Sequence, residues 1–188
     1  MTAALTRFAP FLGISLFFAV GFGWRSWLQY RRYGHTGVIL FQQHDAWGKL
    51  RDAALLVLPA ALLVLTLGQA LLPGSVTVGR LGGLESGPAA LLGATLLAAS
   101  LFFMVAAQLQ MGKSWRIGIE EGACPGLVTW GLYRFCRNPI FAAMLMALLG
   151  LVFLLPSLLT IAILAGAYAG IRRQVADEER YLQRSYAH

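Results

Sequence analysis

Residues 139–171 form an unbroken run of 33 residues without a charged side chain. A helix crosses the hydrocarbon core of a bilayer with about 20 apolar residues, so one helix of this length would overshoot it. Pro156 lies inside the run and divides it, because helices do not tolerate proline well in their interior. Backbone polar groups must be paired in lipid, so each piece has to be helical. The run therefore predicts a tight hairpin of two short helices, 139–155 and 157–171.

Three further apolar runs lie upstream, at 10–27, 53–72 and 88–111. They are continuous and lack the alternation of a β-barrel strand. No A-x-A cleavage pattern follows the first run, which we therefore interpret as a membrane-spanning helix. Only 12% of the residues are charged, against about 25% in soluble domains. The sequence predicts an all-α integral membrane bundle of about five transmembrane helices. It forms a single domain, 1–188, with a site segment at 112–138 and a tail helix at 172–187.

The basic residues are distributed asymmetrically between the two sides of this predicted bundle. One side holds Arg7 and Arg80 only, and the other holds thirteen. These thirteen are Arg25, Arg31, Arg32, Lys49, Arg51, Lys113, Arg116, Arg134, Arg137, Arg172, Arg173, Arg180 and Arg184. The positive-inside rule then places the N-terminus outside and the C-terminus in the cytosol. Topology also explains the net charge of +7, so we do not expect a nucleic-acid partner.

Cysteine and histidine usage indicates neither a disulfide framework nor a metal site. Cys124 and Cys136 form no C-x-x-C pair, and we expect two reduced thiols on the cytosolic side. His35 and His44 have a spacing that is typical of no metal site, so no metal is predicted. Phosphate-binding loops and hydrolase motifs are likewise missing from the sequence.

The predicted cytosolic segment ends with Arg137-Asn138-Pro139, where the fourth apolar helix begins. Proline suits the first turn of a helix and asparagine is a good N-cap, so Asn138 could be only a cap. Arg137 beside a helix N-terminus also creates positive potential suited to a carboxylate or phosphate. Arg137 could instead be only a topology-setting residue near lipid headgroups, and the local sequence leaves these alternatives open.

The tail, placed on a helix, is amphipathic. Ile171, Val175, Leu182 and Tyr186 share one face, and Arg173, Asp177, Arg180 and Arg184 share the opposite face. Glu178 and Glu179 flank the apolar stripe, and carboxylates that border a packing face need partners. Those partners are either arginines of the 113–141 segment or polar groups of a bound cofactor.

These elements together resemble a known family. Leu127-Val128-Thr129, Gly131, Tyr133-Arg134 and Arg137-Asn138-Pro139-x-Phe141, followed by an apolar hairpin and Glu178-Glu179, resemble the isoprenylcysteine carboxyl methyltransferase and phospholipid methyltransferase superfamily. Residues 114–118 are similar to a bacterial branch, which implies a bacterial inner membrane. The sequence departs from the family pattern at Asn138, Leu132 and Phe141, where histidine, proline and tyrosine are common. It also stops at His188, where many relatives continue with a further tail.

The resemblance implies S-adenosylmethionine (SAM) as cofactor, bound on the cytosolic side, and a lipophilic acceptor that enters from the bilayer. It assigns catalytic roles to Arg137, Asn138, Glu178 and Glu179. The expected cofactor-binding residues are Gln108, Leu127, Val128, Thr129, Gly131, Tyr133, Arg137, Asn138, Pro139, Phe141 and Glu179. A carboxylate or thiolate acceptor needs no base, whereas an amine would need one.

Two other functions compete with this interpretation. The first is an NADPH-dependent membrane reductase of sterol type, because such proteins share a related C-terminal architecture. The second is a membrane scaffold without catalytic activity, with Asn138 and the short tail as signs of lost function. The sequence leaves open the methyl acceptor and the oligomeric state.

Overall fold

The computed structural model describes residues 2–41, 46–74, 79–118 and 128–186. These ranges are mostly helical and contain no strand, which confirms the predicted all-α class. The main helices are α1 (Thr2–Phe18), α2 (Arg25–Tyr33), α3 (Ala46–Leu71), α4 (Gly87–Met111), α5 (Pro139–Leu154) and α6 (Leu158–Tyr186). Short 3-10 turns lie at Gly82–Leu84, Gly112–Ser114 and Gly131–Arg134.

The first helix is longer than the predicted span 10–27. A π-helical turn, Ala19–Trp24, joins α1 directly to α2, and Pro10 lies inside α1 instead of at its start. Hydropathy marks where a helix crosses lipid, but hydrogen bonding decides where it ends. The helix ends at Gly34, whose φ of 80° gives the left-handed C-terminal cap that glycine favours.

Three helices are long and apolar enough to cross a membrane: Thr6–Tyr33, Ala46–Leu71 and Gly87–Ser114. α5 is a shorter apolar helix. The chain breaks around Pro156, and the residues expected as a fifth span and a separate tail helix form one helix, α6. No proline follows Pro156 to end that helix. The chain is an integral membrane protein, and its total of about five spans stays a prediction.

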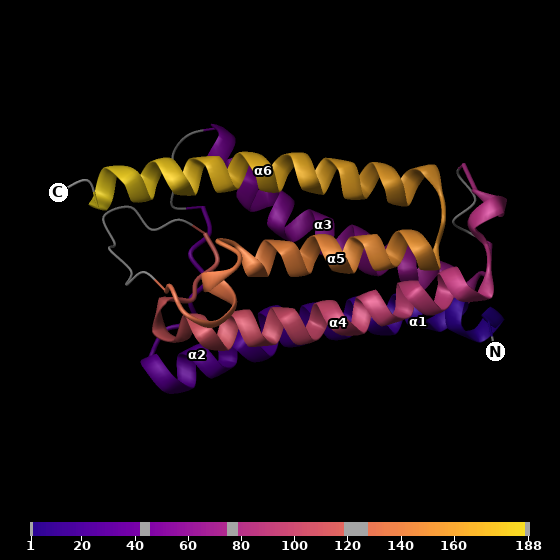
Figure 1. Cartoon of the computed structure of the whole chain (residues 1–188), viewed down its shortest axis with the longest axis horizontal. Coiled ribbons are helices and arrows are strands. Elements are labelled where there is room, and N and C mark those ends of the chain that lie inside the picture. Colours follow the sequence, from indigo (N-terminus) through magenta and orange to yellow (C-terminus); the bar gives the residue numbers. More distant parts are fainter. Residues whose placement is uncertain (1, 42–45, 75–78, 119–127, 187–188) are drawn as a thin grey trace.

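Successive long helices run in alternating directions along one bundle (Figure 1). The N-terminus, the connection before α4 and the turn between α5 and α6 lie at one end, the far end. α2, the chain after α4 and the end of α6 lie at the opposite end, which we call the site end. Residues 112–118 and 128–138 and the end of α6, far apart in sequence, are thereby brought to the same end of the bundle.

α4 and α5 form the closest helix pair in the bundle. A Cβ atom added at Gly93 would lie 2.7 Å from the Gly150 carbonyl oxygen, and one added at Gly150 would lie 2.8 Å from that of Gly93. Small residues of this kind let helix backbones approach closely in membranes. The surrounding core is formed by buried side chains of α1, α3, α4 and α5, including Ile14, Leu62 and Leu151. α5 is therefore held firmly against α4, which fixes where its N-terminus lies.

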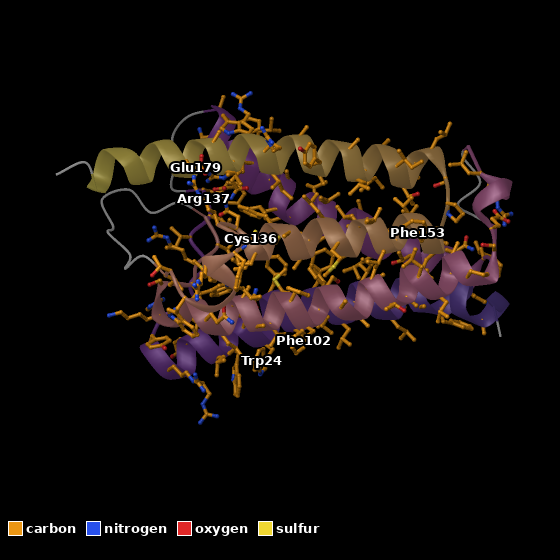
Figure 2. All side chains as sticks on the ribbon, viewed as in Figure 1. Trp24, Phe102, Cys136, Arg137, Phe153 and Glu179 are labelled. Atoms are coloured by element: carbon orange, nitrogen blue, oxygen red, sulfur yellow. The ribbon has the colours of Figure 1, made fainter. Side chains whose placement is uncertain are left out.

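The outside of the bundle is apolar as well. Val64 and Phe102 are 72% and 73% exposed, which would be unfavourable in water but suits contact with lipid tails. The Trp24 and Phe102 side chains point away from the bundle in Figure 2. Trp24 and the exposed Trp27 lie near the site end, and tryptophan is enriched where a membrane protein meets the interface between lipid and water.

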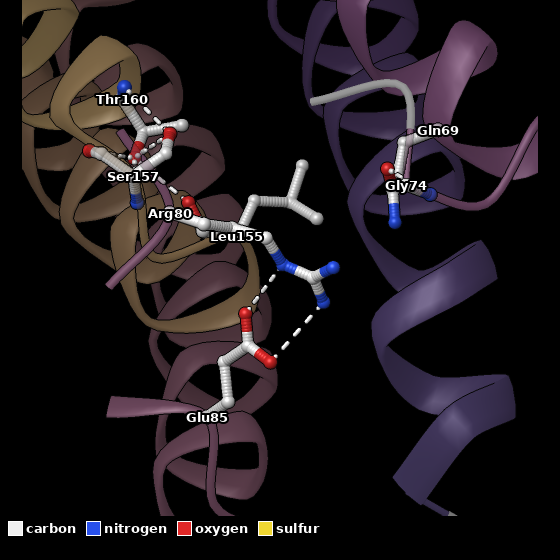
Figure 3. Close-up of polar contacts among 7 residues, drawn as sticks. All are labelled: Gln69, Gly74, Arg80, Glu85, Leu155, Ser157 and Thr160. Atoms are coloured by element: carbon white, nitrogen blue, oxygen red, sulfur yellow. Dashed lines mark hydrogen bonds and ion pairs between the residues drawn. The ribbon is translucent and has the colours of Figure 1, made fainter. Parts of the chain in front are cut away.

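Polar contacts close the far end (Figure 3). Arg80 donates two hydrogen bonds to the Glu85 carboxylate, at 2.6 and 3.1 Å. The Ser157 and Thr160 hydroxyls accept hydrogen bonds from each other's backbone N–H groups, a reciprocal cap at the start of α6. Leu81 N–H also donates to the Pro156 carbonyl, which ties the outer connection to the hairpin.

Candidate functional site

An ion pair joins the two segments that the sequence motif connects. The Arg137 Nη1 atom lies 3.1 Å from Glu179 Oε1, across 42 positions of the chain. Arg137 comes just before α5, Glu179 lies on α6, and their side chains point toward one another (Figure 2). Their side chains are 83% and 43% exposed, so the pair adds under about 1 kcal/mol to stability. Both charges are therefore accessible to a ligand.

The N-terminus of α5 lies directly beside this pair. Asn138 occupies the N-cap position, but its side chain makes no capping hydrogen bond. Pro139 is the first helical residue and lacks an N–H group, as is common at this position. The first turn of a helix presents unpaired N–H groups and a partial positive charge, which favour an anion. The interpretation of Asn138 as only a cap is therefore not supported by its geometry.

The turn before Arg137 is docked on the last turn of α4. Gln110 Oε1 accepts a hydrogen bond of 2.7 Å from the Leu132 N–H, and Tyr133 Oη lies 3.4 Å from the Ala107 carbonyl. Gly131 has a φ of 63°, and a Cβ atom there would lie 2.5 Å from Gln110 Oε1. The positive φ favours glycine at this position, and a side chain here would also displace the Gln110 amide. These contacts fix the position from which the chain continues to Arg137.

An apolar cavity of about 510 Å³ lies among α1, α3, α5 and α6. Its lining includes Phe17, Leu58, Met144 and Ile163, and Phe141 contributes near the start of α5. The volume is within the range of about 300–1,000 Å³ that is usual for small-molecule sites. Such a cavity suits the apolar part of an amphiphile better than a charged cofactor.

Polar residues line the site end of this cavity. Arg51 is buried and its Nε and Nη2 atoms donate to Asp52 Oδ1, at 2.9 and 2.7 Å. Trp47 also lines the cavity, and the Arg173 guanidinium lies 4.0 Å from the centre of its ring. This cation–π contact links α3 to α6. The cavity is thus apolar along the bundle and polar where it approaches the site end.

The predicted site residues fall into three groups. Val128, Thr129, Gly131, Tyr133, Arg137, Asn138, Pro139 and Glu179 all lie at the site end. Phe141 lines the apolar cavity, and Gln108 is buried, with its Nε2 atom donating to the Gly21 carbonyl at 2.7 Å. Leu127 and the Glu178 side chain lie outside the described residues. The structure thus brings together the charged centre of the motif but directs Gln108 toward the π-helical turn.

Two polar residues at the end of the first helix have a structural role that the sequence does not predict. Arg25 and Gln29 are buried, whereas in the sequence Arg25 looks like any other of the thirteen predicted cytosolic basic residues. The one indication in the sequence is the spacing of four residues between Arg25 and Gln29, which places both side chains on the same face of a helix. Their partners are backbone carbonyls of residues 108–115, which no sequence pattern reveals.

Comparison with known protein families gives a match to the second half of the chain. The family described as phospholipid methyltransferase matches residues 88–188, slightly more than half of the chain. No curated protein and no solved structure matches the chain. The matched region includes α4, the turn before Arg137, the α5–α6 hairpin and Glu179. It gives no support to a sterol-type reductase.

Proposed function

This chain belongs to the phospholipid methyltransferase family and is a membrane methyltransferase, and from that premise we propose that it uses SAM to methylate a lipophilic acceptor. When bound, SAM supplies an electrophilic methyl group on a sulfonium centre. The protein then has to bind and align the two reactants and exclude water, without a nucleophile of its own. The observation that carries the proposal is the accessible ion pair between Arg137 and Glu179 at the start of α5.

The methionine part of SAM carries one carboxylate and one ammonium group. Arg137 and Glu179 offer the opposite charges 3.1 Å apart, so a zwitterion can exchange with the ion pair without leaving a charge unpaired. In this proposal Arg137 and the N-terminus of α5 hold the carboxylate, and Glu179 holds the ammonium. The Asn138 amide, which is not used as a cap, is free to orient the cofactor or the acceptor.

The remaining motif residues are proposed to surround the cofactor. Val128, Thr129, Gly131 and Tyr133 lie on the turn that leads to Arg137, and Glu178 is adjacent to Glu179 in sequence. The docking of Leu132 on Gln110 orders this turn before any ligand binds. An ordered site costs less conformational entropy on binding and holds reacting groups in line.

The apolar cavity is proposed to receive the acceptor's hydrocarbon part. Its lining is apolar apart from Arg51 and Gln174, and Phe141 connects it to the start of α5. A lipid chain there would keep its reactive head near the site end and exclude water from it. An acceptor that is a carboxylate, a thiol or an amine is compatible with this arrangement.

The site end is proposed to face the cytosol, with the N-terminus outside. The motivation is the thirteen-to-two division of Lys and Arg between the two ends. Accessibility tags after His188 and within 112–138 should be reactive only from the cytosol, and a tag at Ser86 only from outside. A cytosolic Ser86 would contradict this orientation.

Single substitutions at the ion pair test the cofactor assignment. Arg137→Ala and Glu179→Ala should each weaken binding of S-adenosylhomocysteine (SAH) by roughly tenfold to a hundredfold, because each removes one charge-assisted hydrogen bond. Isothermal titration on the purified protein in detergent measures this, with NADPH as the competing ligand and the melting temperature as a control for folding. If the pair is only structural, both variants should keep SAH affinity within about twofold.

A further inference from the structure

Arg25 is buried at the junction of α4 and the first helix, with 2% of its surface exposed. It is the first residue of α2 and directly follows the π-helical turn Ala19–Trp24. A charge buried within a helix of a membrane protein is costly, so it indicates a specific role when partners surround it. The Arg25 side chain is not part of the ion pair described above and has no role in the proposed chemistry.

Arg25 binds the end of α4. Its Nη2 atom donates to the Gly112 carbonyl at 2.7 Å and lies 3.4 Å from the Gln108 carbonyl, and its Nη1 atom donates to Gln29 Oε1 at 2.7 Å. The last carbonyls of a helix have no partner within the helix, and a cation beside them is favourable. Arg25 therefore acts as a C-terminal cap for α4 that is supplied by a different helix.

Gln29 extends the same network to the chain that follows α4. Its Nε2 atom donates to the Lys113 and Trp115 carbonyls, at 3.0 and 3.3 Å. The Trp115 ring is buried, and the Arg25 guanidinium lies 4.6 Å from its centre. Residues 112–115 are thus fixed on the first helix by two side chains spaced four positions apart.

The turn of α4 that Arg25 caps is the same turn that supports the site. Gln110 lies between the two carbonyls bound by Arg25, and its side chain accepts the hydrogen bond from Leu132. Ala107, one residue before Gln108, lies next to the Tyr133 hydroxyl. A continuous set of contacts therefore connects Arg25, through the end of α4, to the turn that carries Arg137.

The network is not optimised for stability. Arg25 Nε and Gln108 Oε1 are buried and have no hydrogen-bond partner among the described residues. Buried polar groups without partners are destabilising, and apolar residues often replace buried charged networks without loss of stability. Two buried atoms of this network lack hydrogen-bond partners, so its contribution to protein stability does not explain it well. Its effect on the position of the end of α4 explains it better.

We propose that Arg25 is a positioning residue for the cofactor site, holding the end of α4 so that the 131–137 turn presents Arg137 correctly. This inference rests on the proposed function for the identity of the ligand. It goes beyond that function because it assigns a role to a residue distant from the ion pair and outside the family motif. The positioning role of Arg25 can also be tested without a cofactor, because it predicts how mobile the 131–137 turn is.

The cofactor-independent test uses Cys136, an exposed free thiol adjacent to Arg137. A nitroxide label on Cys136, in a Cys124→Ser background, reports the motion of the turn by electron paramagnetic resonance. Arg25→Met should make this label clearly more mobile. On unlabelled protein, the same change should weaken SAH binding by about tenfold, the effect of losing one charge-assisted hydrogen bond.

Arg7→Met is the matched control. Arg7 lies on α1, donates from Nε to the Ala70 carbonyl near the end of α3 at 2.9 Å, and lies at the far end of the bundle. It therefore also caps a neighbouring helix, and its loss should affect the melting temperature without changing label mobility or SAH affinity. Gln29→Leu serves as a milder second variant if Arg25→Met does not fold, with smaller changes expected in the same direction.

Increased label mobility and weaker SAH binding in Arg25→Met, with neither in Arg7→Met, would support the proposal. A lower melting temperature with unchanged mobility and unchanged SAH affinity would overturn it, because Arg25 would then be only a structural residue. If the wild-type protein itself does not bind SAH, the proposed cofactor is wrong. The contrast in label mobility between the two variants then still decides whether Arg25 positions the turn.

Discussion

Replacing Asp52 by alanine is expected to lower the free energy of unfolding by about 3–5 kcal/mol, because it leaves the buried Arg51 charge without its partner. The two side chains are only 6% and 1% exposed, so water cannot replace the lost contact. Asp52 Oδ2 also accepts a hydrogen bond of 2.6 Å from the Phe41 N–H. Phe41 has a φ of 61°, a conformation that non-glycine residues keep only when their surroundings enforce it. The melting temperature should fall by roughly 6–20 °C.

The double variant Arg51→Met/Asp52→Leu provides the control for this prediction. It removes both charges and replaces them with apolar side chains, so its stability should be close to that of the wild type or above it. A double variant as unstable as Asp52→Ala would show that the Phe41 contact matters more than the charge pair. Equal stability of Asp52→Ala and the wild type would contradict the observed burial.

Reversing the charge at Arg137 is expected to weaken cofactor binding more strongly than removing that charge. Arg137→Glu alone places a carboxylate where the cofactor's carboxylate is proposed to bind, and it also repels Glu179. Loss of about two charge-assisted hydrogen bonds corresponds to roughly 3–6 kcal/mol, or about a hundredfold to ten-thousandfold weaker SAH binding. Titration calorimetry, extended by competition for weak binding, measures this range.

The reciprocal variant Arg137→Glu/Glu179→Arg separates a structural role from a binding role. It restores an ion pair between the two positions, so a purely structural role predicts that SAH affinity returns. A binding role predicts that affinity stays low, because the charges then have the wrong order for the methionine part of SAM and for the N-terminus of α5. Recovery of affinity in the double variant would therefore refute our assignment of these two residues.

One end of the proposed site is charged and the other is apolar, and α5 and α6 contribute to both. α5 begins at the charged pair and continues along the apolar cavity, and α6 contributes Ile163 to the cavity and Glu179 to the pair. A water-soluble cofactor and an apolar acceptor can thus meet near the start of α5 without passing through each other's binding region. The contact between Arg173 and Trp47 lies at the boundary between these regions.

The class of the fold and the residues of the candidate motif can be predicted from the sequence alone. Uncharged apolar runs have few alternatives to helices in lipid, because lipid offers no hydrogen-bond partners to the backbone. The motif also predicted Arg137 and Glu179 as site residues, and their side chains lie 3.1 Å apart in the structure. The exact helix ends were harder to predict: α1 begins before Pro10, and α6 continues through residues 171–172 without a break. Hydropathy changes at these points, but the helical hydrogen bonding does not.

Which ionisable side chains are buried, and which groups they bind, follows from the packing of the helices and could not be predicted from the sequence. Arg25 and Arg51 look in the sequence like the other topology-setting arginines, yet both are buried and bonded, whereas Arg137 is exposed. Gln108 lies near the motif in sequence, yet its amide binds the first helix. For Arg25 and Gln108, the backbone partners lie more than 80 positions away, such as the 87 positions between Arg25 and Gly112 and between Gln108 and Gly21. Local sequence carries no information on such distances, because they are set by how the helices pack against one another.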